Sequence, residues 1–200
     1  MFLDWTKNTL DDEYKKTYDH FGISIYRVLT NSLKHEFNRW NREKFLSKFA
    51  QTTIPDEKFV YFPLQVEPER NVSFGAPYFS NQFELIANLA KSLPVDYKLY
   101  VKEHYAMRFK SWRPSKFYRK ILELPNTRLM HFKVDQKELL SKCSFTAVIT
   151  GTTGFEASFF GKPALVFGNV SYSDLSHVIP VKKLDELPML IEEILTKKVN

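Results

Sequence analysis

Residues 148–168 read VITGTTGFEASFFGKPALVFG and contain the pattern that decides the fold. The stretch begins in an apolar, β-branched segment, Phe145–Thr150, and ends in another, Ala164–Phe167, and each predicts a buried strand. Between them lie a Gly-Thr-Thr-Gly turn, a short helix expected over Phe155–Phe160 and a Gly-Lys-Pro turn. A strand, a helix and a second strand in this order form the repeating unit of a parallel α/β sheet.

The same alternation extends upstream and downstream. Further strands are expected at Lys58–Val66, Tyr97–Lys102 and Arg128–Phe132, and helices at Ser80–Leu93 with Ser80 as N-cap, Ser115–Leu124, Asp135–Lys142 and Asp185–Lys198. Asp135 and Glu138 have the spacing of a capping box. The strands are continuously apolar, as strands covered on both faces are. We therefore predict an α/β fold, a Rossmann-like doubly wound parallel sheet of about five strands.

An N-terminal helical arm precedes this domain. Residues 11–50 hold no proline, and apolar side chains recur at spacings of three and four, which predicts an amphipathic helix. These side chains are Phe21, Ile25, Val28, Leu29, Leu33, Phe37 and Trp40. A break at Thr52–Asp56 divides the chain into an arm, 1–54, and a domain, 55–200. The apolar stripe is expected to pack on the domain's own sheet, with docking on another chain as the alternative.

Composition and charge exclude several classes of protein. With 44% hydrophobic residues in 200, the chain has enough apolar mass for a core. The net charge of +6 comes from scattered lysines and arginines without a basic block, which argues against a nucleic-acid partner. The single cysteine, Cys143, cannot form an internal disulfide, and neither a signal peptide nor a membrane-spanning run is found. We expect a cytoplasmic location, leaving open peripheral attachment at the inner membrane face.

The Gly-Thr-Thr-Gly turn is the first candidate site. Four of the 6 glycines in the chain fall within residues 151–168. Gly151 and Gly154 allow close backbone approach, Thr152 and Thr153 offer hydroxyl groups, and the following helix start would favour a phosphate. Glu156, unsuited to touching the phosphate, could accept hydrogen bonds from a ribose. The alternative is a tight turn in which Glu156 serves only the helix dipole.

Two other loops leave the same expected sheet edge. After the second strand, Lys102 and His104 suit a phosphate oxygen or acid catalysis, although His104 could equally be a surface or capping residue. After the first strand, Glu67 and Glu69 suit acid/base work or sugar hydroxyls, with a solvated charged loop as the alternative. Arg108, Lys110 and Arg113 are expected to form a solvated basic edge, with a secondary role in binding an anionic acceptor or donor left open. No histidine spacing predicts a metal site, so no metal or other cofactor is expected.

Taken together, these motifs resemble a known family. FPLQVEPE (62–69), YVKEH (100–104), a helix ending before PN (125–126) and ITGTTGFEASFFGKPALVFG (149–168) look like the C-terminal half of capsule polysaccharide biosynthesis glycosyltransferases, which include β-Kdo transferases. The resemblance covers about residues 58–197. It implies a GT-B arrangement, in which two Rossmann-like domains enclose the active site and the C-terminal one holds a nucleotide-sugar donor without a metal.

The resemblance also implies roles for single residues. His104 corresponds to the family's His-Pro motif at the donor phosphate, although Tyr105 stands here in place of the proline. The other matches are Gly151, Thr152, Thr153 and Gly154 with the phosphate-binding turn, Glu156 with the Glu that follows it, and Gln65 and Glu67 with the motif lining the cleft. His104 and Glu67 are the expected catalytic residues, and Gln65, Lys102, the turn and Glu156 the expected substrate-binding ones.

These expectations add up to a donor-binding domain that transfers a sugar from a nucleotide-sugar to a saccharide or glycolipid acceptor. The resemblance implies a whole N-terminal domain, for which only about fifty residues stand here, so that half is expected from a missing domain or partner chain. One alternative is a non-catalytic nucleotide-binding or assembly module. Another is an epimerase or glycerophosphotransferase on the same architecture.

Overall fold

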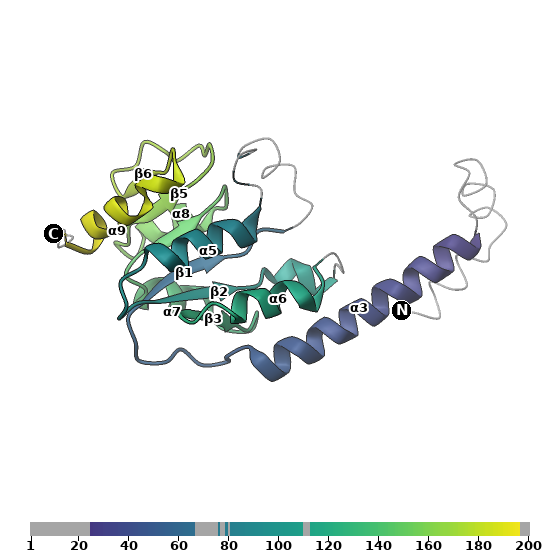
Figure 1. Ribbon diagram of the computed structural model, residues 1–200. Coiled ribbons are helices and arrows are strands. Elements are labelled where there is room, and N and C mark those ends of the chain that lie inside the picture. Colours follow the sequence, from purple (N-terminus) through teal and green to yellow (C-terminus); the bar gives the residue numbers. More distant parts are fainter. Residues whose placement is uncertain (1–24, 67–75, 77–78, 80, 110–112, 197–200) are drawn as a thin grey trace.

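A six-stranded, fully parallel sheet forms the centre of the computed structural model, which describes residues 25–66, 76, 79, 81–109 and 113–196 (Figure 1). The strand order is β3-β2-β1-β4-β5-β6. The strands are β1 (Phe59–Pro63), β2 (Lys98–Lys102), β3 (Thr127–Met130), β4 (Thr146–Val148), β5 (Ala164–Val166) and β6 (Val178–Pro180). The chain order reverses between β1 and β4, which confirms the doubly wound α/β fold and marks the edge where such sheets bind ligands. The edge strand β6 adds one strand to those expected.

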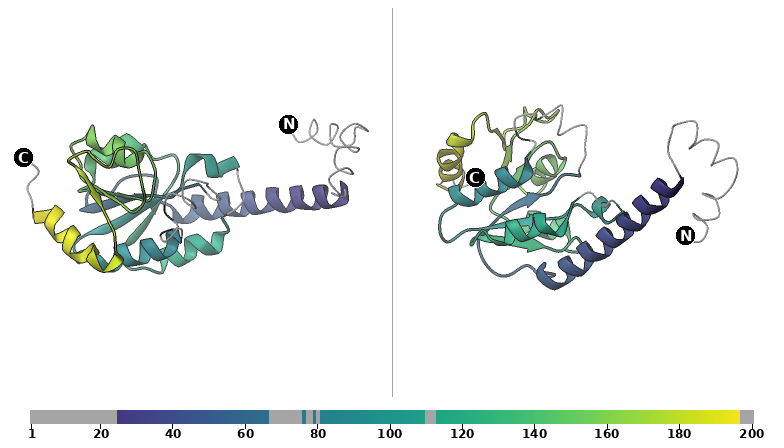
Figure 2. Two further views of the ribbon diagram at one scale, coloured as in Figure 1. Left: turned by 90° about the horizontal axis from the view of Figure 1, so that it is seen from above. Right: turned by 45° about the vertical axis from the view of Figure 1, so that its right-hand side comes forward.

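Alternation along β1 shows how both faces of the sheet are covered. Val60 and Phe62 belong to one core cluster, whereas Phe59 and Tyr61 belong to a second cluster on the opposite face. The first face is covered by α5 (Gln82–Ser92), α6 (Ser115–Leu122) and α9 (Leu187–Thr196), and the second by α7 (Gln136–Lys142) and α8 (Thr153–Ser158) (Figures 1 and 2). Because all four side chains are buried, the continuously apolar strand pattern is explained.

The helix starts differ from those expected in three places. Asn81, rather than Ser80, caps α5, since its Oδ1 accepts a hydrogen bond from the backbone of Glu84 at 3.3 Å. Asp135 caps α7 as expected, but Glu138 pairs with Lys142 at 2.7 Å instead of completing the expected capping box. Helix α8 begins at Thr153, two residues before the expected Phe155, so part of the turn is already helical.

A long helix, α3 (Ile25–Phe49), leads into the domain and extends away from the sheet (Figures 1 and 2). Its buried side chains, Arg42, Phe45 and Leu46, come from its C-terminal part, which packs against α6 and the 3₁₀ helix η2 (Tyr105–Phe109). The expected stripe does not pack on the sheet: Leu33, Phe37 and Trp40 are 60%, 61% and 56% exposed. Phe21 lies outside the described residues.

The connection after α3 is fixed to the edge of the sheet. The backbone nitrogen of Gln51 donates to the carbonyl of Leu129 at 2.8 Å, and the nitrogen of His131 donates to the carbonyl of Gln51 at 2.8 Å. The arm thus joins the domain through backbone hydrogen bonds to β3 as well as through side-chain packing.

Candidate functional site

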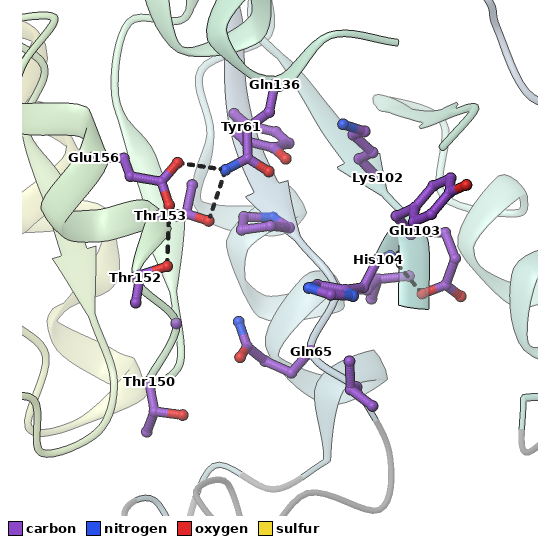
Figure 3. A pocket seen from close by; sticks show the side chains of 15 residues that line it. Tyr61, Gln65, Lys102, Glu103, His104, Gln136, Thr150, Thr152, Thr153 and Glu156 are labelled. Carbon is purple, nitrogen blue, oxygen red and sulfur yellow. Dashed lines mark hydrogen bonds between the residues drawn. The ribbon is translucent and has the colours of Figure 1, made fainter. Parts of the chain in front are cut away.

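A pocket of about 380 Å³ opens at the carboxyl ends of β1, β2 and β4 (Figure 3). This is the edge on which parallel sheets bind ligands, at the point where the strand order reverses. The residues that line it come from the three strand ends and from the starts of α7 and α8. They are Tyr61, Pro63, Leu64, Gln65, Val66, Lys102, Glu103, His104, Tyr105, Gln136, Thr150, Gly151, Thr152, Thr153 and Glu156.

The structure gathers most of the sequence-predicted site residues around this one pocket. Gln65, Lys102, His104, Gly151, Thr152, Thr153 and Glu156 all line it. Gly154, the last residue of the turn, is buried and does not line the pocket. Glu67 and Glu69 lie outside the described residues. The side chains from three separate loops therefore face a common space.

The two glycines of the turn make room for different neighbours. A Cβ atom at Gly151 would lie 2.7 Å from the side-chain nitrogen of Gln65, so Gln65 packs directly on the turn. A Cβ atom at Gly154 would lie 2.7 Å from the Tyr172 hydroxyl and 3.0 Å from a methyl group of Val148. The Tyr172 hydroxyl donates a hydrogen bond to the carbonyl of Gly151, and this bond holds the turn in place.

The turn was expected to bind a phosphate with the help of the helix that follows it, but that helix, α8, has only 6 residues. Thr152 stands at the N-cap but makes no capping hydrogen bond with its side chain. Its hydroxyl instead donates to Glu156 Oε1 at 3.0 Å. Because the Thr152 hydroxyl already donates to Glu156, the Thr153 hydroxyl and the turn itself, more than a long helix dipole, are what the site presents to an anion.

Glu156 is held by two neighbours. Besides the Thr152 hydroxyl, the side-chain amide of Gln136 donates to Glu156 Oε2 at 2.7 Å (Figure 3). A carboxylate has about four lone-pair sites, so two contacts leave acceptor capacity on the pocket side. Gln136 is a pocket residue that sequence reasoning missed. Its position, just after the Asp135 N-cap at the expected binding edge, was the available signal.

His104 presents its imidazole ring to the pocket (Figure 3). The backbone nitrogen of Ala106 donates to His104 Nδ1 at 3.1 Å. With Nδ1 acting as acceptor, the neutral ring carries its proton on Nε2. His104 is therefore prepared to donate a hydrogen bond to an oxygen atom of a ligand.

Lys102 brings positive charge to the same pocket. Lys102 is 8% exposed, and burial lowers the pKa of its ammonium group from the usual value. The nearby Asp135 carboxylate acts in the opposite direction and raises this pKa. A partly desolvated cation at the end of a strand suits an anionic ligand, which would add to the negative charge of Asp135.

Arg113 corrects one expectation. It was expected on a solvated basic edge, but it is 2% exposed and paired with Glu103, Nη1 lying 2.7 Å from each carboxylate oxygen. Lys110 lies outside the described residues. Sequence reasoning also missed Glu103, although it directly follows the buried strand β2 in the alternation of Leu99 and Val101, and a buried acid requires a partner.

Gln65 is positioned through its backbone. Its nitrogen donates to Gln82 Oε1 at 2.8 Å, and the Gln82 amide donates back to the carbonyl of Gln65 at 3.2 Å. The buried Gln82, in the first turn of α5, therefore fixes the end of β1 against the pocket.

The described residues hold neither a candidate metal centre nor a candidate membrane-spanning helix. No group of three or more histidine, cysteine, aspartate and glutamate side chains in that part of the chain is arranged to hold a metal ion. None of the helices described is long and apolar enough to cross a membrane. The expectation that no cofactor is used stays a prediction.

Comparison with known proteins places these features in a family. The family model described as capsule polysaccharide biosynthesis protein matches residues 9–175. That match includes α3 and all three loops that form the pocket. Among curated protein sequences, none matches the chain significantly.

Solved structures share the fold at low sequence identity. The β-Kdo 2,7 transferase of KpsC from Thermosulfurimonas dismutans is 21% identical with a TM-score of 0.52, over 76% of this chain and 52% of that one. The β-Kdo 2,4 transferase of the same protein is 15% identical with a TM-score of 0.52, over 74% and 49%. The UDP-GlcNAc 2-epimerase of Methanocaldococcus jannaschii, in complex with UDP-GlcNAc and UDP, is 16% identical with a TM-score of 0.51, over 80% and 43%. The chain thus spans about half the length of these structures.

Proposed function

The chain belongs to the capsule polysaccharide biosynthesis protein family, and from this premise we propose that residues 55–200 form the donor-binding domain of a glycosyltransferase. The donor would be a nucleotide-sugar, and the product a capsule or other surface polysaccharide. One observation carries the proposal: three strand ends bring Gln65, His104 and the Gly151–Gly154 turn around one pocket.

The chemistry follows from the charges in the pocket. When the anomeric carbon leaves the phosphate oxygen, negative charge develops on the nucleotide phosphate. His104 would donate from Nε2 to that oxygen, Lys102 would supply a positive charge, and the Thr153 hydroxyl of the turn would donate to another phosphate oxygen. The Thr152 hydroxyl, which donates to Glu156, would orient that carboxylate. Glu156 would accept from the ribose hydroxyls. Transfer would then depend on positioning and electrostatics within this chain.

Acceptor binding is assigned to a second domain or partner chain. The chain spans 52% and 49% of the two KpsC structures, which leaves about half of each without a counterpart. We propose that the missing half supplies the contacts to a saccharide or glycolipid acceptor. Glu67, which follows the Gln65 end of the pocket in sequence, is retained as a candidate catalytic carboxylate.

The test is a calorimetric titration of the full chain with UDP, CDP and CMP. We expect one of them to bind at or below millimolar concentration. His104→Ala should weaken binding about tenfold, the usual effect of one lost hydrogen bond to a charged group. Glu156→Ala should weaken binding of the nucleotides too. Glu138→Ala is the matched control, since this exposed carboxylate pairs with Lys142 away from the pocket. Absence of binding for all three nucleotides would reject the proposal.

A second function, that of a non-catalytic assembly module, is favoured by one observation. Leu33, Phe37 and Trp40 lie on α3 with their side chains more than half exposed. Assays of the isolated chain with nucleotide-sugars separate the options: release of free sugar or transfer indicates an enzyme, epimerised sugar indicates the epimerase chemistry, and binding without turnover supports the module.

A further inference from the structure

One buried ion pair joins two of the three loops that form the pocket. The Glu103 and Arg113 side chains are 2% and 1% exposed, and Arg113 Nη1 lies 2.7 Å from each carboxylate oxygen. The Tyr118 hydroxyl of α6 donates to Glu103 Oε2. The guanidinium group also lies over the ring of Phe117, 4.9 Å from its centroid. The pair is thus enclosed by α6 and has no contact with bulk water.

Each end of the pair holds a residue of the pocket. The backbone nitrogen of His104 donates to Glu103 Oε1 at 2.7 Å, which fixes the start of the His104 loop. Arg113 Nη2 donates to the backbone carbonyl of Gln65 at 2.8 Å, which fixes the end of β1. A single charged pair therefore connects the backbones of His104 and Gln65.

Stability alone does not account for this arrangement. Desolvating two charges costs about as much as their attraction returns, and well-packed apolar side chains of similar volume stabilise a core equally well or better. An apolar pair would not, however, hydrogen-bond to the His104 nitrogen and the Gln65 carbonyl. The polar pair is distinguished by the geometry that it imposes on these two groups.

We propose that Glu103 and Arg113 are positioning residues that hold His104 and Gln65 at the spacing required by a nucleotide phosphate. This inference rests on the proposed function, because it assumes that the pocket binds a nucleotide. Neither residue needs to touch the ligand. Tyr118 completes the unit by keeping Glu103 Oε2 occupied, so that the carboxylate stays oriented toward Arg113 and the His104 nitrogen.

The arm takes part in the same unit. Arg42 of α3 is 2% exposed, and its positive charge acts on the Tyr118 hydroxyl. Burial and the Glu103 carboxylate raise the pKa of Tyr118, while the charges of Arg113 and Arg42 lower it in part. The phenol stays protonated and remains a hydrogen-bond donor to Glu103. Helix α3, which packs against α6 and η2, thereby contributes a buried positive charge to the surroundings of the positioning unit.

The decisive experiment replaces the whole pair in the full-length chain. The double variant Glu103→Leu/Arg113→Met removes both buried charges together, so its thermal unfolding midpoint should fall by only a few degrees, the cost of the hydrogen bonds lost by the Tyr118 hydroxyl, the His104 nitrogen and the Gln65 carbonyl. If the pair positions the pocket, UDP, CDP or CMP should bind at least tenfold more weakly, and the His104 ring Cε1–Hε1 NMR signal should shift or broaden without ligand. Wild-type affinity together with an unchanged His104 signal would overturn the proposal.

A matched control and a conservative variant complete the design. Glu57 and Arg128 form a second ion pair, which also accepts a hydrogen bond from a tyrosine, Tyr100, but none of these residues lines the pocket. Glu57→Leu/Arg128→Met should therefore leave the His104 signal and nucleotide binding unchanged. An equal effect from this control would contradict a specific role for the Glu103 pair.

If the double variant does not fold, the single variant Arg113→Lys tests the positioning role instead. Lysine retains the charge, but its three donors sit on one nitrogen, so it cannot reproduce the fork in which Nη1 serves Glu103 and Nη2 serves the Gln65 carbonyl. Nucleotide binding should weaken about threefold to tenfold, and wild-type affinity in this variant would refute positioning. The NMR readout needs no nucleotide. A wild-type chain that binds none would thus reject the proposed function, whereas the His104 signal would still report on positioning.

Discussion

At the residue scale, Lys102 shows how the site is maintained at a cost to stability. Its ammonium group stands at the end of β2, largely removed from water, and burial lowers its pKa although Asp135 lies near. A lysine whose pKa is lower in the folded state destabilises the fold while it is charged. The unfolded chain binds more protons between the lowered pKa and the ordinary value of 10.5, so the free energy of unfolding rises with pH across that window.

Lys102→Met is therefore expected to stabilise the protein and to weaken its proposed function. At neutral pH the unfolding midpoint should rise by about 2 °C, the change typical of somewhat less than 1 kcal/mol in a chain of this size. The gain should shrink as pH rises toward the ordinary lysine pKa, because the wild-type side chain then loses its charge. Nucleotide binding should fall about tenfold. Calorimetry at several pH values measures both effects.

Lys98→Met is the control for this substitution. Lys98 lies at the opposite end of the same strand and does not line the pocket. The Lys98→Met substitution should leave nucleotide binding unchanged. A Lys102→Met variant that is less stable than the wild type would show that the ammonium group is stabilised in the fold, contrary to the argument from its burial.

The same scale shows what sequence could and could not predict at the site. His104 and the Gly-Thr-Thr-Gly turn were predicted because strand ends of a parallel sheet converge on one edge, and Gln65 was predicted because the family resemblance implies it. The burial of Arg113 was not, because its partner Glu103 is ten residues away and a helix, α6, must pack over both. Charged residues in a loop look solvated in sequence until the tertiary contact that buries them is known.

At the scale of elements, the order of strands and helices was predicted well and their ends less so. Apolar runs located five strands, but β6 (Val178–Pro180) is a three-residue edge strand that ends in proline and is only partly buried. Such a segment carries little hydrophobic signal. The start of α8 at Thr153 was missed because glycine at its second position lowers helix propensity, while the turn above it is fixed by the distant Tyr172.

Two glycines flank α8, Gly151 before it and Gly161 after it. Substitution by alanine is expected to affect nucleotide binding at the first and stability at the second. A Cβ atom at Gly151 would displace only the mobile end of Gln65, so Gly151→Ala should change stability by less than about 0.5 kcal/mol. It should weaken nucleotide binding several-fold, because Gln65 moves in the pocket. Gly161 has a φ of 62°, so Gly161→Ala should lower stability by about 1 kcal/mol.

Urea denaturation and nucleotide titration of both variants test this pair. Nothing lies within 4 Å of a Cβ atom at Gly161, which follows the end of α8 and does not line the pocket. Its substitution should leave binding unchanged. If Gly161→Ala weakened binding while Gly151→Ala did not, the placement of the ligand against the turn and Gln65 would be wrong.

At the scale of the whole molecule, the described part of the arm is buried in the fold at its C-terminal end and carries exposed apolar side chains farther along the helix. Phe45 and Leu46 belong to the same core cluster as the strands and α5, α6 and α9. The family match begins at residue 9 and so includes α3. Leu33, Phe37 and Trp40 remain exposed, and Lys44 lies over the Trp40 ring, 4.9 Å from its centroid. The sequence predicted the helix, but periodicity could not tell which face the domain buries.

Two leucines of this one helix provide the sharpest test of that division. Leu46 is 1% exposed and Leu33 is 60% exposed. Leu46→Ala should cost about 3 kcal/mol through lost burial and the cavity left behind, whereas Leu33→Ala should stay within about 0.5 kcal/mol. Both changes have the same small effect on helix propensity, so the difference in urea-induced unfolding reports packing alone. Because Leu46 lies in the shared core, helix and sheet should unfold in a single transition by circular dichroism and tyrosine fluorescence. Equal losses from the two variants would mean that the Leu33 face is packed as well, and the exposed stripe would then no longer be available to a second domain or partner chain.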